Sequence, residues 1–113
     1  MTFDDVLAYG LTLADTIRKS YYGTPSLKTG GRVFASVGRD PRSFVMMIDL
    51  DTVEMLKETG SVTYWQTRRY VGWPNVLVRL DTTNPARVCA MINIAHGWAR
   101  TRPKPRPGTR GKP

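Results

Sequence analysis

The sequence has little of the chemistry on which small disulfide and metal proteins depend. Its 113 residues include one cysteine, Cys89, and one histidine, His96. A single cysteine excludes an internal disulfide, and these two residues alone cannot assemble a zinc site of Cys and His ligands. We therefore expect neither a metal nor a cofactor, and the cysteine content suits the reducing cytoplasm.

Long apolar runs and a basic leader are also missing. No stretch approaches the roughly 18 apolar residues that a membrane-spanning helix needs. The chain opens with the acidic pair Asp4 and Asp5, where a signal peptide would be basic. The sequence therefore predicts a cytoplasmic protein with no membrane segment. A hydrophobic content of 41% is enough to fold one compact domain, with a monomer as the default state.

Acidic residues are scarce, and the last part of the chain has none. Residues 1–100 carry 12 basic and 9 acidic side chains, whereas residues 101–113 carry 5 basic side chains, four prolines and two glycines. We predict a folded domain over 1–100 and a disordered basic tail over 101–113. Arg102, Lys104 and Arg106 of this tail would reach phosphates. A tail that only improves solubility is the alternative interpretation.

Helical spacing and capping residues predict three helices. The first covers residues 3–18, because Thr2 and Asp5 have capping-box spacing and apolar residues recur behind them. A short second helix covers residues 52–59 and ends at Gly60. The third begins after Asn84, with a proline in its first turn, and runs to about residue 100.

Between these helices, β-branched and aromatic residues predict strands. They cover residues 26–28, 32–37, 44–48, 62–66 and 75–80. Gly30 and Gly31 join the first two strands in a tight hairpin, because this turn needs positive φ angles. The predicted fold class is therefore α+β: a two-layer domain in which N-terminal, short middle and C-terminal helices pack on a five-stranded antiparallel sheet.

Two segments stand out, YGTPSLKTGGRVFA at residues 22–35 and YWQTRRYVGWPNVLVRLD at residues 64–81. Both resemble the MmcQ/YjbR family of small bacterial proteins. The resemblance implies an α+β fold similar to type III secretion chaperones, with hairpins in a double-wing arrangement and a role in binding DNA. Family members have no established enzymatic activity. Where the family often has Pro-His-Tyr, this chain has Arg68-Arg69-Tyr70, and its tail is longer and more basic.

A DNA-binding protein needs cations for phosphates and groups that reach the bases. The predicted contacts lie on hairpins, turns, the long loop before residue 75 and the tail: Lys28, Arg32, Arg39, Arg42, Arg68, Arg69, Tyr70, Trp73, Arg102, Lys104 and Arg106. For Tyr70 and Trp73 we favour packing on the sheet over stacking on a base. The second hypothesis is a protein-interaction or small-ligand module that uses Tyr64, Tyr70 and Trp73.

No catalytic or metal site is predicted. His96 is expected to be a surface or helix-capping histidine, and Cys89 a small buried side chain rather than a nucleophile. Asp49 and Asp51 precede a helix, which favours N-capping over metal binding. Nucleotide-binding glycine loops and nucleophile elbows are absent from the sequence. We therefore expect a protein that is not an enzyme.

Overall fold

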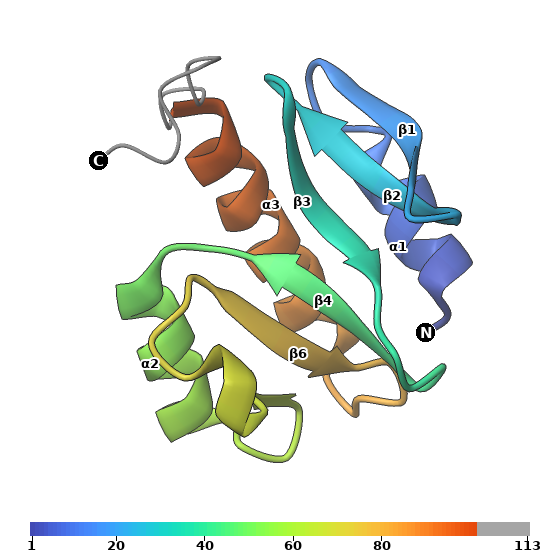
Figure 1. Ribbon diagram of the computed structural model, residues 1–113. Coiled ribbons are helices and arrows are strands. Elements are labelled where there is room, and N and C mark those ends of the chain that lie inside the picture. Colours follow the sequence, from blue (N-terminus) through green and yellow to red (C-terminus); the bar gives the residue numbers. More distant parts are fainter. Residues whose placement is uncertain (102–113) are drawn as a thin grey trace.

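The structure is a computed structural model, and it describes residues 1–101. Figure 1 shows its elements in chain order. They are α1 (Phe3–Gly10), β1 (Thr16–Tyr21), β2 (Thr24–Thr29), β3 (Arg32–Val37), β4 (Ser43–Met47), α2 (Leu50–Thr59), β5 (Tyr64–Trp65), the 3-10 helix η1 (Arg68–Tyr70), β6 (Asn75–Arg79) and α3 (Pro85–Thr101). The predicted α+β class is confirmed.

The sheet has six strands in the order β1-β2-β3-β4-β6-β5, and all neighbours in it are antiparallel. The predicted number of five strands is wrong, because the expected helix over 3–18 stops at Gly10 and residues 16–21 form β1. Ala14 and Ile17 continue the helical spacing of the apolar residues, but both are exposed. Pairing with β2 along the whole of β1 overrides that local pattern.

A tight contact at Gly10 brings the end of α1 against β2. A Cβ atom at this position would collide with the side chain of Leu27, which is fully buried. The glycine therefore allows the helix backbone to approach the strand closely. At the other end of α1, Thr2 and Asp5 form the predicted capping box, which is confirmed.

The turn between α1 and β1 is held by groups from α3 and β2. His96 is buried, and its Nε2 donates to the carbonyl oxygen of Ala14 at 2.7 Å. Thr29 donates to the carbonyl of Asp15, and Arg100 forms an ion pair with the Asp15 carboxylate at 3.1 Å. The expectation of a surface or capping histidine is therefore wrong, because His96 lies on the helix face that packs against Phe34.

The other predicted elements are present, with changed boundaries. Gly30 and Gly31 have φ angles of 59° and 80° and form the predicted hairpin turn. Asp49 caps α2 by accepting from the amide of Thr52, and Asn84 caps α3 by accepting from Arg87. The strand predicted over 62–66 is shorter than expected and consists of β5 alone.

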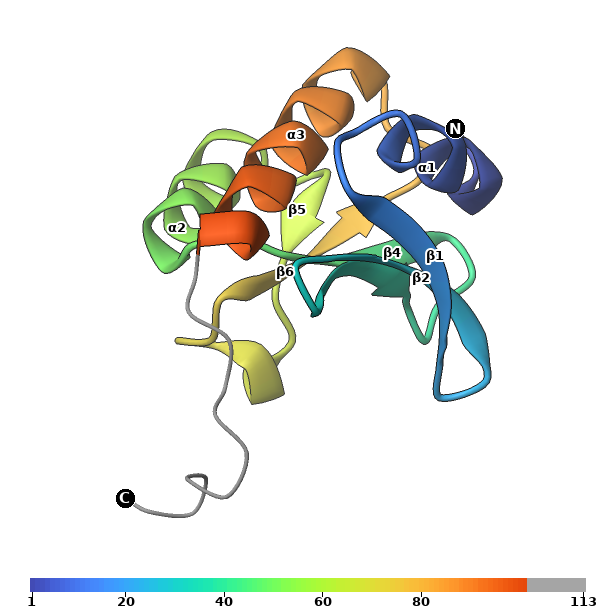
Figure 2. The ribbon, with the colours of Figure 1, turned by 90° about the horizontal axis from the view of Figure 1, so that it is seen from above.

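All three helices lie on the same side of the sheet, as Figure 2 shows. The core fills the space between the helices and the sheet. Its largest buried side chains come from five strands, β2 to β6, and from all three α-helices, and they include Phe34, Phe44, Met46, Tyr64, Leu56 and Ile92. In the part of the chain that the structure describes, no α-helix covers the opposite side of the sheet, and only the short 3-10 helix η1 lies beside it. We call this side the open face.

Candidate functional site: the open face of the sheet

The strand register defines which side chains share the open face. One row of paired residues crosses all six strands: Lys19, Ser26, Ser36, Val45, Leu77 and Trp65. Above the middle of this row the face is hollowed, with a volume of about 840 Å³. We call this cavity the sheet hollow. Its floor is largely apolar and includes Val37, Val45, Met47 and Leu77.

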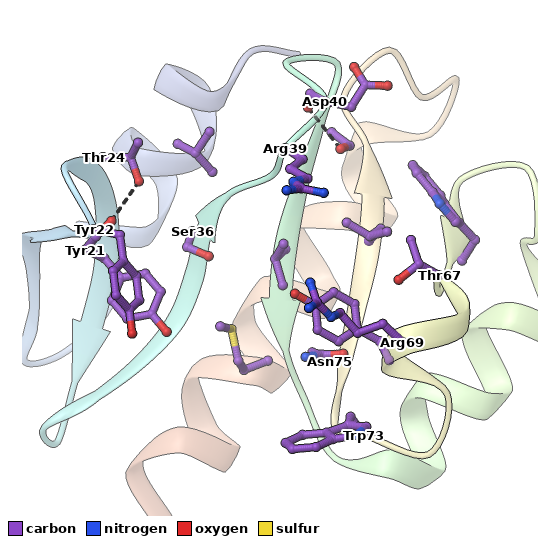
Figure 3. A pocket seen from close by; sticks show the side chains of 17 residues that line it. Tyr21, Tyr22, Thr24, Ser36, Arg39, Asp40, Thr67, Arg69, Trp73 and Asn75 are labelled. Carbon is purple, nitrogen blue, oxygen red and sulfur yellow. Dashed lines mark hydrogen bonds between the residues drawn. The ribbon is translucent and has the colours of Figure 1, made fainter.

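The walls of the sheet hollow come from opposite edges of the sheet. One wall is the turn between β1 and β2, with Tyr21 and Tyr22, and the other is the loop before β6, with Arg69 and Trp73. Figure 3 shows the two tyrosines across the hollow from these two residues. Arg39 enters from the loop that joins β3 to β4. Segments far apart in the sequence therefore meet at one site.

Aromatic side chains at the walls remain accessible to solvent. Tyr22 is 91% exposed and Trp73 is 61% exposed, whereas Tyr21 lies against Tyr22 with a centroid distance of 4.7 Å. The expectation that Trp73 packs on the sheet is therefore wrong. Tyr70 is half-buried and fits that expectation better. Large exposed aromatic groups are typical of binding surfaces, because their burial against a partner is favourable.

The loop that carries Arg69 and Trp73 is organised by one amide side chain. Gln66 Nε2 donates to the carbonyl oxygens of Tyr70 at 2.8 Å, Trp73 at 3.0 Å and Asn75 at 2.8 Å. Lys57 donates to Gln66 Oε1 at 2.7 Å, which fixes the orientation of the amide. The loop is therefore anchored from below, while its outer side chains stay free to contact a ligand.

Two arginines line the sheet hollow without an internal partner. Within residues 1–101, neither Arg39 nor Arg69 forms an ion pair or a side-chain hydrogen bond. The one lining carboxylate, Asp40, is already paired with Arg42 at 3.3 Å. Hydrogen bonds from the backbone amide and guanidinium of Arg42 lower the pKa of Asp40, which keeps this carboxyl ionised and engaged. The two lining arginines therefore remain available to an anion.

Opposite charges are concentrated in different parts of the domain. Of the 9 acidic residues in the sequence, most belong to α1 or to α2 and its N-cap: Asp4, Asp5, Asp49, Asp51, Glu54 and Glu58. Most basic residues before residue 101 lie instead on strands, turns and η1: Arg18, Lys19, Lys28, Arg32, Arg39, Arg42, Arg68, Arg69 and Arg79. Helices α1 and α2 therefore carry most of the negative charge, whereas α3 is basic through Arg87 and Arg100, and the sheet and its loops carry most of the positive charge.

The structure brings together only some of the predicted contacts. Arg39, Arg69, Tyr70 and Trp73 all line the sheet hollow, but Arg68, Arg42, Lys28 and Arg32 do not. Lys28 pairs with Val33, and Arg32 pairs with Thr29, so these two cations point to opposite faces of the sheet. Arg102, Lys104 and Arg106 lie outside the described residues.

Sequence reasoning missed several residues of the hollow. The sequence predicts neither a helix nor a strand at Tyr21 and Tyr22, and it gives Trp65 no role in binding. Tyr64, chosen for an aromatic group, is 2% exposed and contacts the core, whereas its neighbour Trp65 faces the hollow. Alternation along β5 is the signal that separates the two residues. The first turn has no comparable signal, because Tyr22-Gly23 lacks the asparagine, aspartate or glycine that a two-residue hairpin turn favours at its first position.

Other candidate chemistry is not gathered into a site. Cys89 is half-buried on α3, and within residues 1–101 no three His, Cys, Asp or Glu side chains form a metal-binding group. Among the helices of this part of the chain, none combines the length and the apolar character needed to cross a bilayer. Comparison with protein-family models and with curated proteins finds no match for this chain.

Proposed function

We propose that the protein is a non-enzymatic nucleic-acid-binding protein, with DNA as its ligand, and that the open face of the sheet is its binding surface. One observation carries the proposal: exposed aromatic groups and unpaired arginines meet in the sheet hollow, while most acidic residues lie on the helices. Phosphates would bind the arginines, and the aromatic groups would contact bases or sugars. The likeness of residues 22–35 and 64–81 to the MmcQ/YjbR family supports the same function.

The basic residues after position 101 supply a second source of phosphate contacts in this proposal. They carry five cations and no carboxylate, against a small excess of positive charge in residues 1–100. A phosphate-neutralising segment contributes affinity that depends strongly on salt and weakly on sequence. The open face would then contribute the contacts that discriminate between ligands.

A salt titration with paired arginine variants tests this function. The affinity for a DNA oligonucleotide should fall as salt increases, by about 0.7 log units per log unit of salt for each phosphate contact on a single strand and about 0.9 on duplex DNA. The R39A/R69A variant should bind more weakly and with a shallower slope. The control R18A/R68A removes the same charge from positions outside the sheet hollow and should retain the open-face contribution.

Removal of residues 102–113 should also reduce the slope, because five cations are lost. Absence of DNA binding by the full chain at low salt would refute the proposed function. Equal losses in R39A/R69A and R18A/R68A would show that binding depends on total charge and not on the open face.

The apolar floor of the sheet hollow favours a second candidate function. Val37, Val45, Met47 and Leu77 would suit an apolar segment of a protein or a small aromatic molecule. In that case the affinity for the ligand would be insensitive to salt, and R39A/R69A would bind as well as the unmodified protein. Nuclear magnetic resonance shifts of these four residues, measured with DNA and with a fragment library, distinguish the two candidates.

A further inference from the structure

We propose that the open face takes single-stranded nucleic acid, with unpaired bases stacked on Tyr22 and Trp73. This inference rests on the proposed function and specifies its ligand. Bases in a duplex already stack on each other, so their flat faces are not available to a protein side chain. An unpaired base offers such a face, and stacking on an aromatic side chain is largely independent of base identity.

Charge in and around the sheet hollow also favours a single strand. Duplex-binding proteins commonly neutralise about 6 to 10 phosphates. The hollow offers Arg39 and Arg69, and the predicted cations Lys28 and Arg32 are divided between the two faces of the sheet. Within the hollow, two arginines match the phosphates of a short single strand, and stacking supplies the rest of the affinity there. The cations after position 101 would add affinity for a single strand and for a duplex alike.

The size and the lining residues of the sheet hollow suit an unstacked base. Its volume of about 840 Å³ is in the range of pockets that enclose a small molecule. Thr24, Ser36, Thr67 and Asn75 contribute polar groups among the apolar residues that line it. A base could therefore rest on an apolar floor while its polar edge meets hydroxyl or amide groups.

The backbone at Tyr22 gives independent support. Its φ angle is 53°, in the left-handed region that bulky residues rarely occupy, and Gly23 follows with a φ angle of 80°. This turn favours asparagine or glycine at the position of Tyr22. The side chain gains little from the fold in return, because it is 91% exposed. An unfavourable backbone position that displays an aromatic group to solvent is a feature associated with binding.

The test compares a labelled single strand of about 12 nucleotides, within the span of known single-strand sites, with the duplex formed from it, at one salt concentration. We expect Y22A and W73A each to weaken single-strand binding about 5- to 100-fold and to leave duplex binding within about twofold. Y22F and W73F should retain most of the affinity. V71A is the matched control, because Val71 is 62% exposed in the same loop but does not line the hollow.

A second measurement, the melting temperature, distinguishes a role of Tyr22 in binding from a role in the structure of the β1–β2 turn. Tyr22→Asn should raise the melting temperature, because asparagine tolerates the left-handed backbone, and should still weaken single-strand binding. If Tyr22 had a purely structural role, the substitution would not raise the melting temperature and weaken single-strand binding at the same time.

Two outcomes would overturn the inference. One is equal affinity for single strand and duplex; the other is unchanged single-strand affinity in both Y22A and W73A. If R39A/R69A still lowers the affinity in either case, the proposed function stands and only its ligand class is wrong. If neither oligonucleotide binds the full chain, the proposed function fails as well.

Discussion

Gly10 and Gly97 both lie in helices, but only Gly10 is required by close packing. Gly10 ends α1 against the buried side chain of Leu27, whereas a Cβ atom at Gly97 of α3 would meet no heavy atom within 4 Å. Helix propensity alone favours alanine at both positions, by about 1 kcal/mol. At Gly10, but not at Gly97, the steric clash of a Cβ atom with Leu27 outweighs this gain in helix propensity.

We therefore expect opposite effects on stability from the same substitution. Gly10→Ala should lower the free energy of unfolding by about 1–3 kcal/mol, since extra volume must be accommodated beside Leu27. Gly97→Ala should raise it by up to about 1 kcal/mol. Urea unfolding followed by circular dichroism measures both values. A stabilised Gly10→Ala variant would contradict the close approach of α1 to β2.

Tyr64 links stability to alkaline pH. Burial raises the pKa of its phenol above the usual value of 10.0, and the nearby Arg87 guanidinium only partly offsets this effect. Among the described residues its hydroxyl has no hydrogen-bond partner, although Arg87 lies over the ring at 5.4 Å. The unfolded chain loses this proton first as pH rises. The contribution of neutral Tyr64 is therefore complete below pH 10 and is lost as the pH passes through the raised pKa.

Tyr64→Phe should remove this pH dependence. At pH 7 the variant should be as stable as the unmodified protein, or more stable by about 1 kcal/mol, because an unsatisfied buried hydroxyl is removed. Above pH 10 the stability difference should grow in favour of the variant. Urea unfolding at several pH values measures this difference, and Tyr22→Phe, an exposed tyrosine, is the control. A difference that shrinks above pH 10 would contradict the buried position of the phenol.

At the scale of elements, the loop before β6 depends on Gln66. Three backbone carbonyls share the two N–H bonds of its side-chain amide. Gln66→Leu keeps much of the volume and removes the donors, so the carbonyls of Tyr70, Trp73 and Asn75 would lose a partner. We expect a loss of about 1–3 kcal/mol in stability and faster amide exchange in the loop.

Nucleic-acid binding should fall in the same variant, because Arg69 and Trp73 would no longer be held in position. Lys57→Met removes the bond to Gln66 Oε1 but leaves the amide donors in place, so its effect on affinity should be small. Titration with the single strand measures both variants. Equal losses would show that α2, and not the amide, holds the loop.

Most elements could be predicted from the sequence, and the exceptions depend on contacts between different elements. Capping residues identified the starts of α1 and α3, and paired glycines identified the β2–β3 hairpin, whereas α2 begins at Leu50, two residues before its predicted start, because Asp49 is its N-cap. Strand β1 was missed because Ala14 and Ile17 extend a helical pattern, while the partner that fixes its structure, β2, follows it in the chain. The site was predicted in part: loop cations and aromatics were found, but the division of side chains between two faces depends on register. His96 was misplaced because its partner Ala14 is distant in sequence.

At the scale of the whole molecule, the separation of charge has a simple structural basis. Helices α1 and α2 begin with acidic residues, which cap their amides and interact favourably with the helix dipole. The edge strand β1 carries Arg18 and Lys19 at exposed positions, where charge also discourages edge-to-edge association of sheets. Requirements of local stability thus concentrate negative charge on α1 and α2, away from the open face, while cations are spread over the strands, the turns and α3. An approaching polyanion would be oriented toward the open face before contact.

The two walls of the sheet hollow stand at opposite ends of the strand order, one on the β1–β2 turn and the other beside β5 and β6. The cavity therefore exists only after the last edge strand has paired, so a partly folded chain cannot bind through it. Edge strands are also the first parts of a sheet to open. A ligand that spans both walls would slow this opening, and the amide exchange of β1 and β5 would become more like that of the central strand β4. Binding at this site would thus act as a final step in the cooperative folding of the sheet.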